Sequence, residues 1–244
     1  MNGRPWALVT GGAKRLGRHL SLYLAARGYG VLVHYRRSAE AADEVVAEIV
    51  ANGGAARAVS ANLEDPDSIE ALFDSIADRE GSLSLLVNNV GNYDPKPLAD
   101  VTPRQWNRLI GANLNGTWAC CWHARKLMKT GQIVTMGYAG VEALVANPEA
   151  TPYQISKTGL LLLTKSMAAD WAPAIRANMI SPGQLENSID LPERVADAIP
   201  AGRAGALSDI AQALGFLLDA DYVTGQNIDV AGGYRLRGSV PDPI

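Results

Sequence analysis

The sequence has few of the residues that build disulfide frameworks and metal sites. Its two cysteines, Cys120 and Cys121, are adjacent, and its three histidines are scattered along the chain. Two neighbouring thiols are too few for a disulfide framework, and the histidines lack the spacing of metal ligands. We therefore expect no metal site and a reducing compartment, the cytoplasm.

Long apolar runs and excess charge are also lacking. No stretch approaches the roughly 18 apolar residues of a membrane span, and no apolar signal region precedes the first expected strand at Trp6. The net charge is −3 in 244 residues, which gives no indication of a nucleic-acid or acidic-membrane partner. The 48% hydrophobic content indicates a globular protein with a full core.

Short apolar runs alternate with helical patterns along the chain. Such alternation predicts an α/β fold, in which right-handed crossovers connect parallel strands. We expect a single doubly wound Rossmann domain over residues 1–244, with helices on both faces of a seven-stranded sheet in the order 3-2-1-4-5-6-7. The expected strands are 6–10, 31–33, 56–61, 83–87, 133–136, 175–180 and 226–230. The expected helices are 15–27, 38–51, 67–78, 103–128 (broken near Gly111 or Gly116), one from Thr151, and 208–218.

Ligands of such sheets bind beyond the carboxyl ends of the strands. The first strand ends in a glycine-rich turn, Thr10–Gly17. Glycines let the backbone approach a pyrophosphate, and the following helix N-terminus offers free N–H groups. The spacing is not G-x-G-x-x-G, so a simple strand-to-helix connection is the alternative interpretation.

The second strand ends in His34-Tyr35-Arg36-Arg37-Ser38 and has no carboxylate to bind the 2′-hydroxyl of NAD. Arginines at this position neutralise a 2′-phosphate instead. Lys14 and Arg15 lie on the neighbouring turn. We therefore expect NADP(H); the alternative is a solvated basic loop.

Tyr153 and Lys157 are four residues apart at the start of an expected helix. Thr151 as the N-cap, Pro152 at the first position and Gln154 in a capping box predict that start. Residues four apart share a helix face, and a nearby ammonium lowers a tyrosine pKa from its usual value of about 10. The pair is a candidate for proton transfer, and chance spacing is the alternative.

In order, these motifs resemble the short-chain dehydrogenases/reductases. They include the Thr10 turn, Asn88-Asn89-Val90-Gly91, Tyr153–Lys157, Ser181-Pro182-Gly183 and Val223 to Gly233. The resemblance implies hydride transfer with NAD(P)(H), Tyr153 as general acid/base, and Lys157 holding the nicotinamide ribose. It also implies that Asn113 supports a proton relay.

The strand-end residues, the resemblance and the departures from it together give the expected sites. The catalytic residues would be Tyr153, Lys157 and Asn113. The cofactor-binding residues would be Gly11, Lys14, Arg15, Leu16, Gly17, Tyr35, Arg36, Arg37, Ser38, Asn62, Leu63, Asn89, Val90, Gly91, Tyr153, Lys157, Pro182 and Gly183. The substrate residues would be Arg15, Tyr93, Tyr138 and Gln184.

A narrower resemblance is to the pteridine reductases. Arg15, the stretch His34–Ala41 and Tyr93 carry it. It implies that Arg15 reaches the cofactor phosphates and the pterin, and that Tyr93 stacks on the pterin ring. A surface-loop aromatic is the alternative for Tyr93.

Two departures from the family bear on the substrate. Tyr138 occupies the position of the usual serine after the fifth strand, where pteridine reductases often have aspartate. Gln184 follows Ser181-Pro182-Gly183, near the position where the family often has threonine. A substrate lid is expected at about 184–205, with Leu191, Val195 and Ile199 in its later part.

The interpretation favoured by these motifs is an NADPH-dependent dihydropterin reductase. A carbonyl or 3-oxoacyl reductase and an inactive NADP-binding sensor or scaffold are the alternatives. The expected partners are a small-molecule substrate and further copies of the chain, in a tetramer or dimer. These copies would pack through the helix from Pro103 and the Tyr153 helix.

Overall fold

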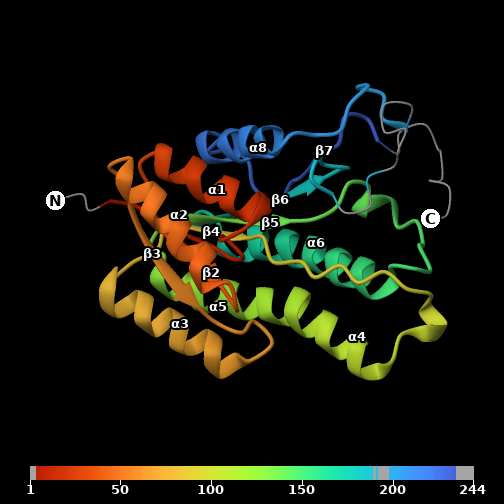
Figure 1. Ribbon diagram of the computed structural model, residues 1–244, viewed down its shortest axis with the longest axis horizontal. Helices are drawn as coiled ribbons and strands as arrows, with labels where there is room; N and C mark the ends of the chain where they lie inside the picture. Colours follow the sequence, from red (N-terminus) through yellow and green to blue (C-terminus); the bar gives the residue numbers. More distant parts are fainter. Residues whose placement is uncertain (1–3, 189–190, 192–197, 235–244) are drawn as a thin grey trace.

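A single parallel sheet forms the centre of the protein (Figure 1). The computed structural model describes residues 4–188, 191 and 198–234. The strand order is β3-β2-β1-β4-β5-β6-β7, which confirms the predicted topology. The strands are β1 (Trp6–Val9), β2 (Gly30–Tyr35), β3 (Ala55–Ser60), β4 (Leu85–Asn88), β5 (Gly131–Met136), β6 (Ile175–Pro182) and β7 (Asn227–Val230).

Helices cover both faces of the sheet (Figure 1). One layer contains α1 (Arg15–Ala26), α2 (Ala39–Ala51) and α8 (Leu207–Asp219). The other contains α3 (Pro66–Arg79), α4 (Pro103–Ile110), α5 (Gly116–Leu127) and α6 (Thr151–Trp171). The inner strands are mostly apolar because both of their faces are buried: β1 is apolar along its length, and β4 is apolar up to Asn88. Short 3₁₀ turns form at Leu98–Asp100 and Val141–Ala143.

The long helix expected from Pro103 is interrupted by a π-helical turn at Gly111–Asn115. Thr102 and Gln105 form a capping box at the start of α4. A Cβ at Gly116 would lie 2.1 Å from the carbonyl oxygen of Leu63, so only glycine lets α5 approach this closely. The predicted break is confirmed, and it lies beside the loop that follows β4.

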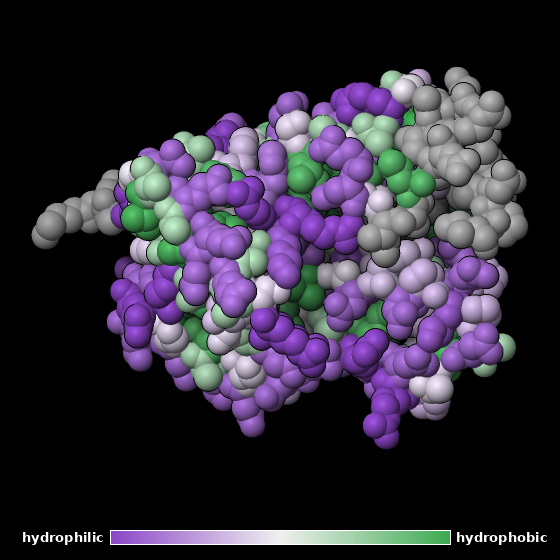
Figure 2. All heavy atoms as spheres, in the orientation of Figure 1, coloured by the Kyte–Doolittle hydropathy of each residue, from purple (hydrophilic) through white to green (hydrophobic). Residues whose placement is uncertain are grey.

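The surface has no dominant apolar face in the view of Figure 2, where polar side chains cover most of the molecule. No helix in the described part of the chain is long and apolar enough to cross a membrane. Because all seven strands run in one direction, their carboxyl ends share one edge. The site residues predicted from the sequence follow these ends.

Candidate active site

Lys157 is a buried cation on the first turns of α6. Its side chain is only 2% exposed, and Nζ donates a hydrogen bond of 2.7 Å to the carbonyl oxygen of Met136. Burial lowers the pKa of Lys157 to about 8. Nζ lies 5.7 Å from the centre of the Tyr153 ring, so the predicted pair forms on one helix face.

The expected capping box at the start of α6 does not form. The helix begins at Thr151 as predicted, but Ala150 is the N-cap. The Gln154 side chain accepts the N–H of Asn147 (2.8 Å) and donates to the carbonyl oxygen of Val145 (2.8 Å). The loop before α6 folds back over the first turn of the helix. The backbone groups of this loop therefore form hydrogen bonds with the Gln154 side-chain amide, which was expected to cap the helix.

A cavity of about 320 Å³ lies at the carboxyl edge of the sheet. It joins expected cofactor residues and expected catalytic residues in one space. Among its described lining residues, the charged side chains are Arg15 and Lys157, both cations. The lining residues used below are Arg15, Leu16, Asn89, Gly91, Tyr93, Tyr138, Tyr153, Lys157, Pro182, Gly183 and Gln184.

Aromatic rings flank Tyr153 inside this cavity. The Tyr93 ring meets it edge-on at 5.1 Å between centroids, and the Tyr138 ring lies at 5.9 Å. The Tyr138 hydroxyl also accepts a long hydrogen bond of 3.4 Å from Nε2 of Gln154. The two tyrosines expected at the substrate, Tyr93 and Tyr138, therefore both lie beside Tyr153, the expected acid/base.

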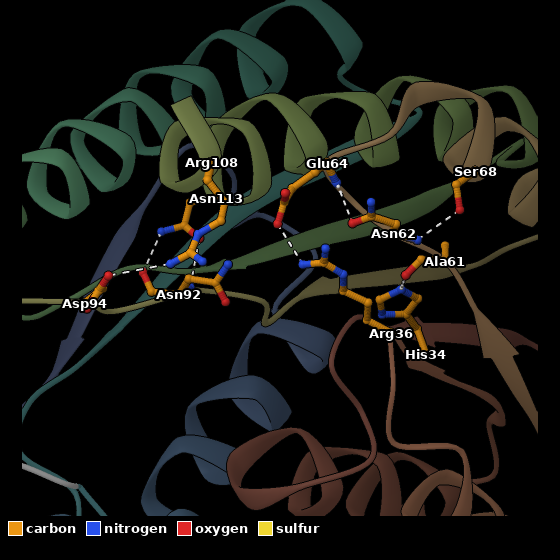
Figure 3. Close-up of polar contacts among 10 residues, drawn as sticks. All are labelled: His34, Arg36, Ala61, Asn62, Glu64, Ser68, Asn92, Asp94, Arg108 and Asn113. Atoms are coloured by element: carbon orange, nitrogen blue, oxygen red, sulfur yellow. Dashed lines mark hydrogen bonds and ion pairs between the residues drawn. The ribbon is translucent and has the colours of Figure 1, made fainter. Parts of the chain in front are cut away.

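Asn113 lies in the π-helical turn and is fully buried. Its Oδ1 accepts the N–H of Asn92 (2.8 Å), and its Nδ2 donates to the carbonyl oxygen of Asn92 (2.9 Å; Figure 3). Nδ2 also lies 3.4 Å from the Ser156 hydroxyl on α6. Asn113 thus joins the loop that carries Tyr93 to the helix that carries Tyr153.

The glycine-rich turn fits the close approach of a phosphate. Gly11 adopts φ +62°, and a Cβ on Gly17 would lie 2.0 Å from the carbonyl oxygen of Gly11. Helix α1 begins at Arg15, directly after Lys14, and presents its N-terminal N–H groups here. Arg15 has φ +50°, and its guanidinium donates to the carbonyl oxygen of Asn187, which lies within the segment Gln184–Ser188.

The end of β2 carries the expected 2′-phosphate cations. Arg36 forms a 2.7 Å ion pair with Glu64, which follows β3 (Figure 3). The N–H of Glu64 donates to Oδ1 of Asn62, so a local turn fixes the backbone that carries the carboxylate. Arg37 is exposed, Tyr35 is half-buried, and Ser38 precedes α2. Arg36 and Arg37 are cations that would suit a 2′-phosphate, whereas the Glu64 carboxylate paired with Arg36 would oppose it.

The end of β4 is tied to the end of β1. The Thr10 hydroxyl accepts the N–H of Asn89 (2.9 Å), and Nδ2 of Asn89 donates to the carbonyl oxygen of Thr10 (3.1 Å). A Cβ on Gly91 would lie 2.9 Å from Nζ of Lys157, so this glycine leaves room for the lysine. Val90 packs against the core.

The segment expected as a lid is joined at its base. Gly205 donates its N–H to the carbonyl oxygen of Gln184 (2.8 Å) and accepts that of Glu186 (2.9 Å). Leu185 and Ile199 are buried. Val195 lies outside the described residues.

The fold and the cavity define a nucleotide-dependent oxidoreductase. Residues 11–235 match the family profile described as "Enoyl-(Acyl carrier protein) reductase". The chain belongs to the short-chain dehydrogenase/reductase family. Membership confirms the predicted class, a short-chain reductase with NADP(H) as cofactor.

Curated relatives and solved structures resemble the chain over nearly its whole length. The 3-oxoacyl-[acyl-carrier-protein] reductase FabG of Staphylococcus aureus is 36% identical over 239 residues, 93% of this chain and 96% of the relative. The 3beta-hydroxysteroid dehydrogenase 1 of Eggerthella lenta is 34% identical over 247 residues, 94% of this chain and 93% of the relative. A gluconate 5-dehydrogenase from Burkholderia cenocepacia, solved with NADP and tartrate, superposes with a TM-score of 0.86 at 29% identity, covering 98% of this chain and 97% of that one.

Proposed function

We propose that the protein reduces a ketone of a small molecule to a secondary alcohol, with NADPH as the reductant. One observation carries this proposal. A single cavity brings Arg15, Leu16 and Gly183, expected at the cofactor, together with Tyr153 and Lys157. The bound cofactor supplies the hydride that forms the new C–H bond.

The chain's own residues supply the proton and the positioning. Tyr153 donates its phenolic proton to the carbonyl oxygen of the substrate. General acid catalysis of this kind raises the reaction rate roughly 10²–10⁴-fold. Lys157 holds the nicotinamide ribose and places a positive charge beside the phenol. Tyr138 donates to the carbonyl oxygen in place of the serine usual in the family. Asn113 acts on the same site, because it holds the loop that carries Tyr93.

A ketone is favoured over a pterin for two reasons. The relatives include 3-oxoacyl reductases, whose substrate is a ketone. The described lining residues also include no aspartate or glutamate, whereas the amino and ring N–H groups of a pterin are donors that a carboxylate would bind. The alternative of a carbonyl or 3-oxoacyl reductase is therefore better supported than the dihydropterin reductase.

The experiment measures NADPH oxidation with acetoacetyl-CoA, a panel of small ketones and dihydropterins. We expect turnover with at least one ketone and loss of turnover in Tyr153→Phe, with NADPH binding retained. Turnover with dihydropterins alone would support the pteridine interpretation. An enzyme that binds NADPH and oxidises it with none of these substrates would indicate a sensor, and a fully active Tyr153→Phe enzyme would refute the role of Tyr153.

Two further parts of the proposal concern the whole molecule. Segment 184–205 covers the substrate, starting from the base that Gly205 forms with Gln184.

The chain assembles into dimers or tetramers through α4, α5 and α6, where Trp118, Trp122 and Leu162 are exposed at 42%, 44% and 68%. Light scattering on the purified protein tests the assembly, and a monomer at micromolar concentration would contradict it.

A further inference from the structure

His34 lies at the end of β2 and is 2% exposed. Its Nδ1 accepts the N–H of Gly11 at 3.0 Å, and its own carbonyl oxygen accepts the N–H of Gly12 at 2.9 Å. Its Nε2 lies 3.2 Å from the carbonyl oxygen of Ala61, beyond the end of β3 (Figure 3). One residue therefore joins the ends of three neighbouring strands.

These contacts fix the tautomer of His34. A backbone N–H only donates, so Nδ1 must be an unprotonated acceptor toward Gly11. The proton of the neutral ring is then on Nε2 and is donated to Ala61. Burial favours this neutral form, since it lowers the pKa of His34 to about 4.

The bond to Gly11 reaches the phosphate turn directly. The carbonyl oxygen of Gly11 packs against Gly17, where even a Cβ would not fit, and Nδ2 of Asn89 lies 3.4 Å from the same oxygen. A shift of Gly11 would therefore shift the N-terminus of α1. On the other side, Ala61 is followed by Asn62, which with Glu64 and Arg36 forms the end of the site expected to bind the adenosine 2′-phosphate.

We propose that His34 is a positioning residue for NADPH. Its neutral imidazole sets the position of the pyrophosphate turn relative to the adenosine end of the site, and the two halves of the cofactor are bound together only in this arrangement. This inference rests on NADPH as the cofactor and not on the identity of the substrate.

The experiment titrates NADPH, by its fluorescence, into the wild type, His34→Leu and His34→Asn. His34→Leu removes both side-chain bonds, whereas the Asn oxygen keeps an acceptor near the Nδ1 position. We expect the Kd for NADPH to rise at least tenfold in His34→Leu and severalfold less in His34→Asn. The Kd for adenosine 2′,5′-bisphosphate, which lacks the pyrophosphate, should rise less than the Kd for NADPH in the same variant.

Asn178→Leu is the matched control. Asn178 is as buried as His34 and forms hydrogen bonds with Val223 and Gln226, away from β1, β2 and β3. The Asn178→Leu substitution should therefore lower the stability of the protein without changing the Kd for NADPH.

An unchanged Kd for NADPH in His34→Leu would overturn the proposal. Equal weakening of NADPH and of the bisphosphate, or an equal effect of Asn178→Leu, would also overturn it. Should His34→Leu fail to fold, His34→Asn decides by the same comparison: NADPH weakened more than the bisphosphate supports the proposal, and an unchanged Kd overturns it. A wild-type protein that binds NADPH but turns over no ketone would count against the proposed function only, and the Kd comparison among the variants would still test the role of His34.

Discussion

Asn113 forms a pair of hydrogen bonds with the backbone of Asn92, accepting its N–H at 2.8 Å and donating to its carbonyl oxygen at 2.9 Å. A second tie, the ion pair of Arg108 with Asp94 at 3.5 Å, lies two residues further along the same loop (Figure 3). Tyr93 lies between these two anchors and meets the Tyr153 ring. The π-helical turn thus positions Tyr93 against Tyr153, the proposed catalytic tyrosine.

Replacing Asn113 should affect turnover more than cofactor binding. Asn113→Leu removes both bonds to Asn92 and releases the loop that places Tyr93. A displacement of about 1 Å in an active site costs roughly 10²-fold in rate, so we expect kcat/KM for the ketone to fall by about that factor. Steady-state kinetics and NADPH titration check this. Asn115→Leu, in the same turn but exposed, is the control, and equal losses in both variants would contradict the prediction.

The hydroxyl of Tyr138 should stabilise the reacting oxygen. Tyr138→Phe keeps the ring but removes the donor, and loss of one such donor costs roughly 10²–10³-fold in kcat. The Kd for NADPH should not change. Tyr23→Phe removes a phenol on α1 that contacts Arg27, the residue directly after the helix, and should leave kcat unchanged. A Tyr138→Phe enzyme with wild-type kcat would exclude Tyr138 from this role.

Cofactor preference should depend on Arg36. Arg36→Ala removes a cation and leaves Glu64 without its ion-pair partner Arg36 beside the expected 2′-phosphate. A hydrogen bond to a charged group contributes about 1.5–3 kcal/mol, so the preference for NADPH over NADH should fall roughly tenfold to a hundredfold. The ratio of kcat/KM values for the two cofactors measures it. Arg18→Ala, which breaks the exposed ion pair with Glu48, should leave the ratio unchanged.

The free energy of unfolding of the cofactor-free protein should depend on pH through Lys157. Its pKa is about 8 in the folded protein and 10.5 when unperturbed. Between these values the unfolded chain holds more protons, so stability rises with pH, by on the order of 3 kcal/mol in total. Urea unfolding at pH 7.5 and 10 measures the change. Lys157→Met removes this titration, so an equal rise in both proteins would contradict the assignment.

The topology was predictable, and most of the candidate site could be proposed, because both depend on local patterns. Apolar runs separated by helical patterns define parallel strands, and the chemistry then follows from what each strand end carries, as with Gly11, Arg36 and Lys157. The ends of the strands and helices differ from the expected ones by one or two residues. For example, β6 was expected to end at residue 180 and continues to Pro182.

The contacts that could not be predicted depend on which residues come close together only when the chain is folded. The pattern around Gln154 favoured a capping box, but the loop before α6 offered better-placed partners at Val145 and Asn147. The role of His34 could not be predicted from the sequence, because its partners Gly11 and Ala61 follow two other strands, β1 and β3. The tie between Asn113 and Asn92 likewise depends on a π-helical turn that only the packed helix reveals.

The turns at the amino ends of the strands offer a practical use. Gly28, Gly53 and Gly81 adopt φ of +89°, +79° and +74° in the turns before β2, β3 and β4, and a Cβ at each would meet nothing within 4 Å. This edge lies a full strand length from the cavity, and Asn52 and Ser82 beside these glycines are exposed. A dye or a solid support attached there would leave the cavity facing the solution, so the enzyme could be immobilised in a flow reactor without obstructing its substrate.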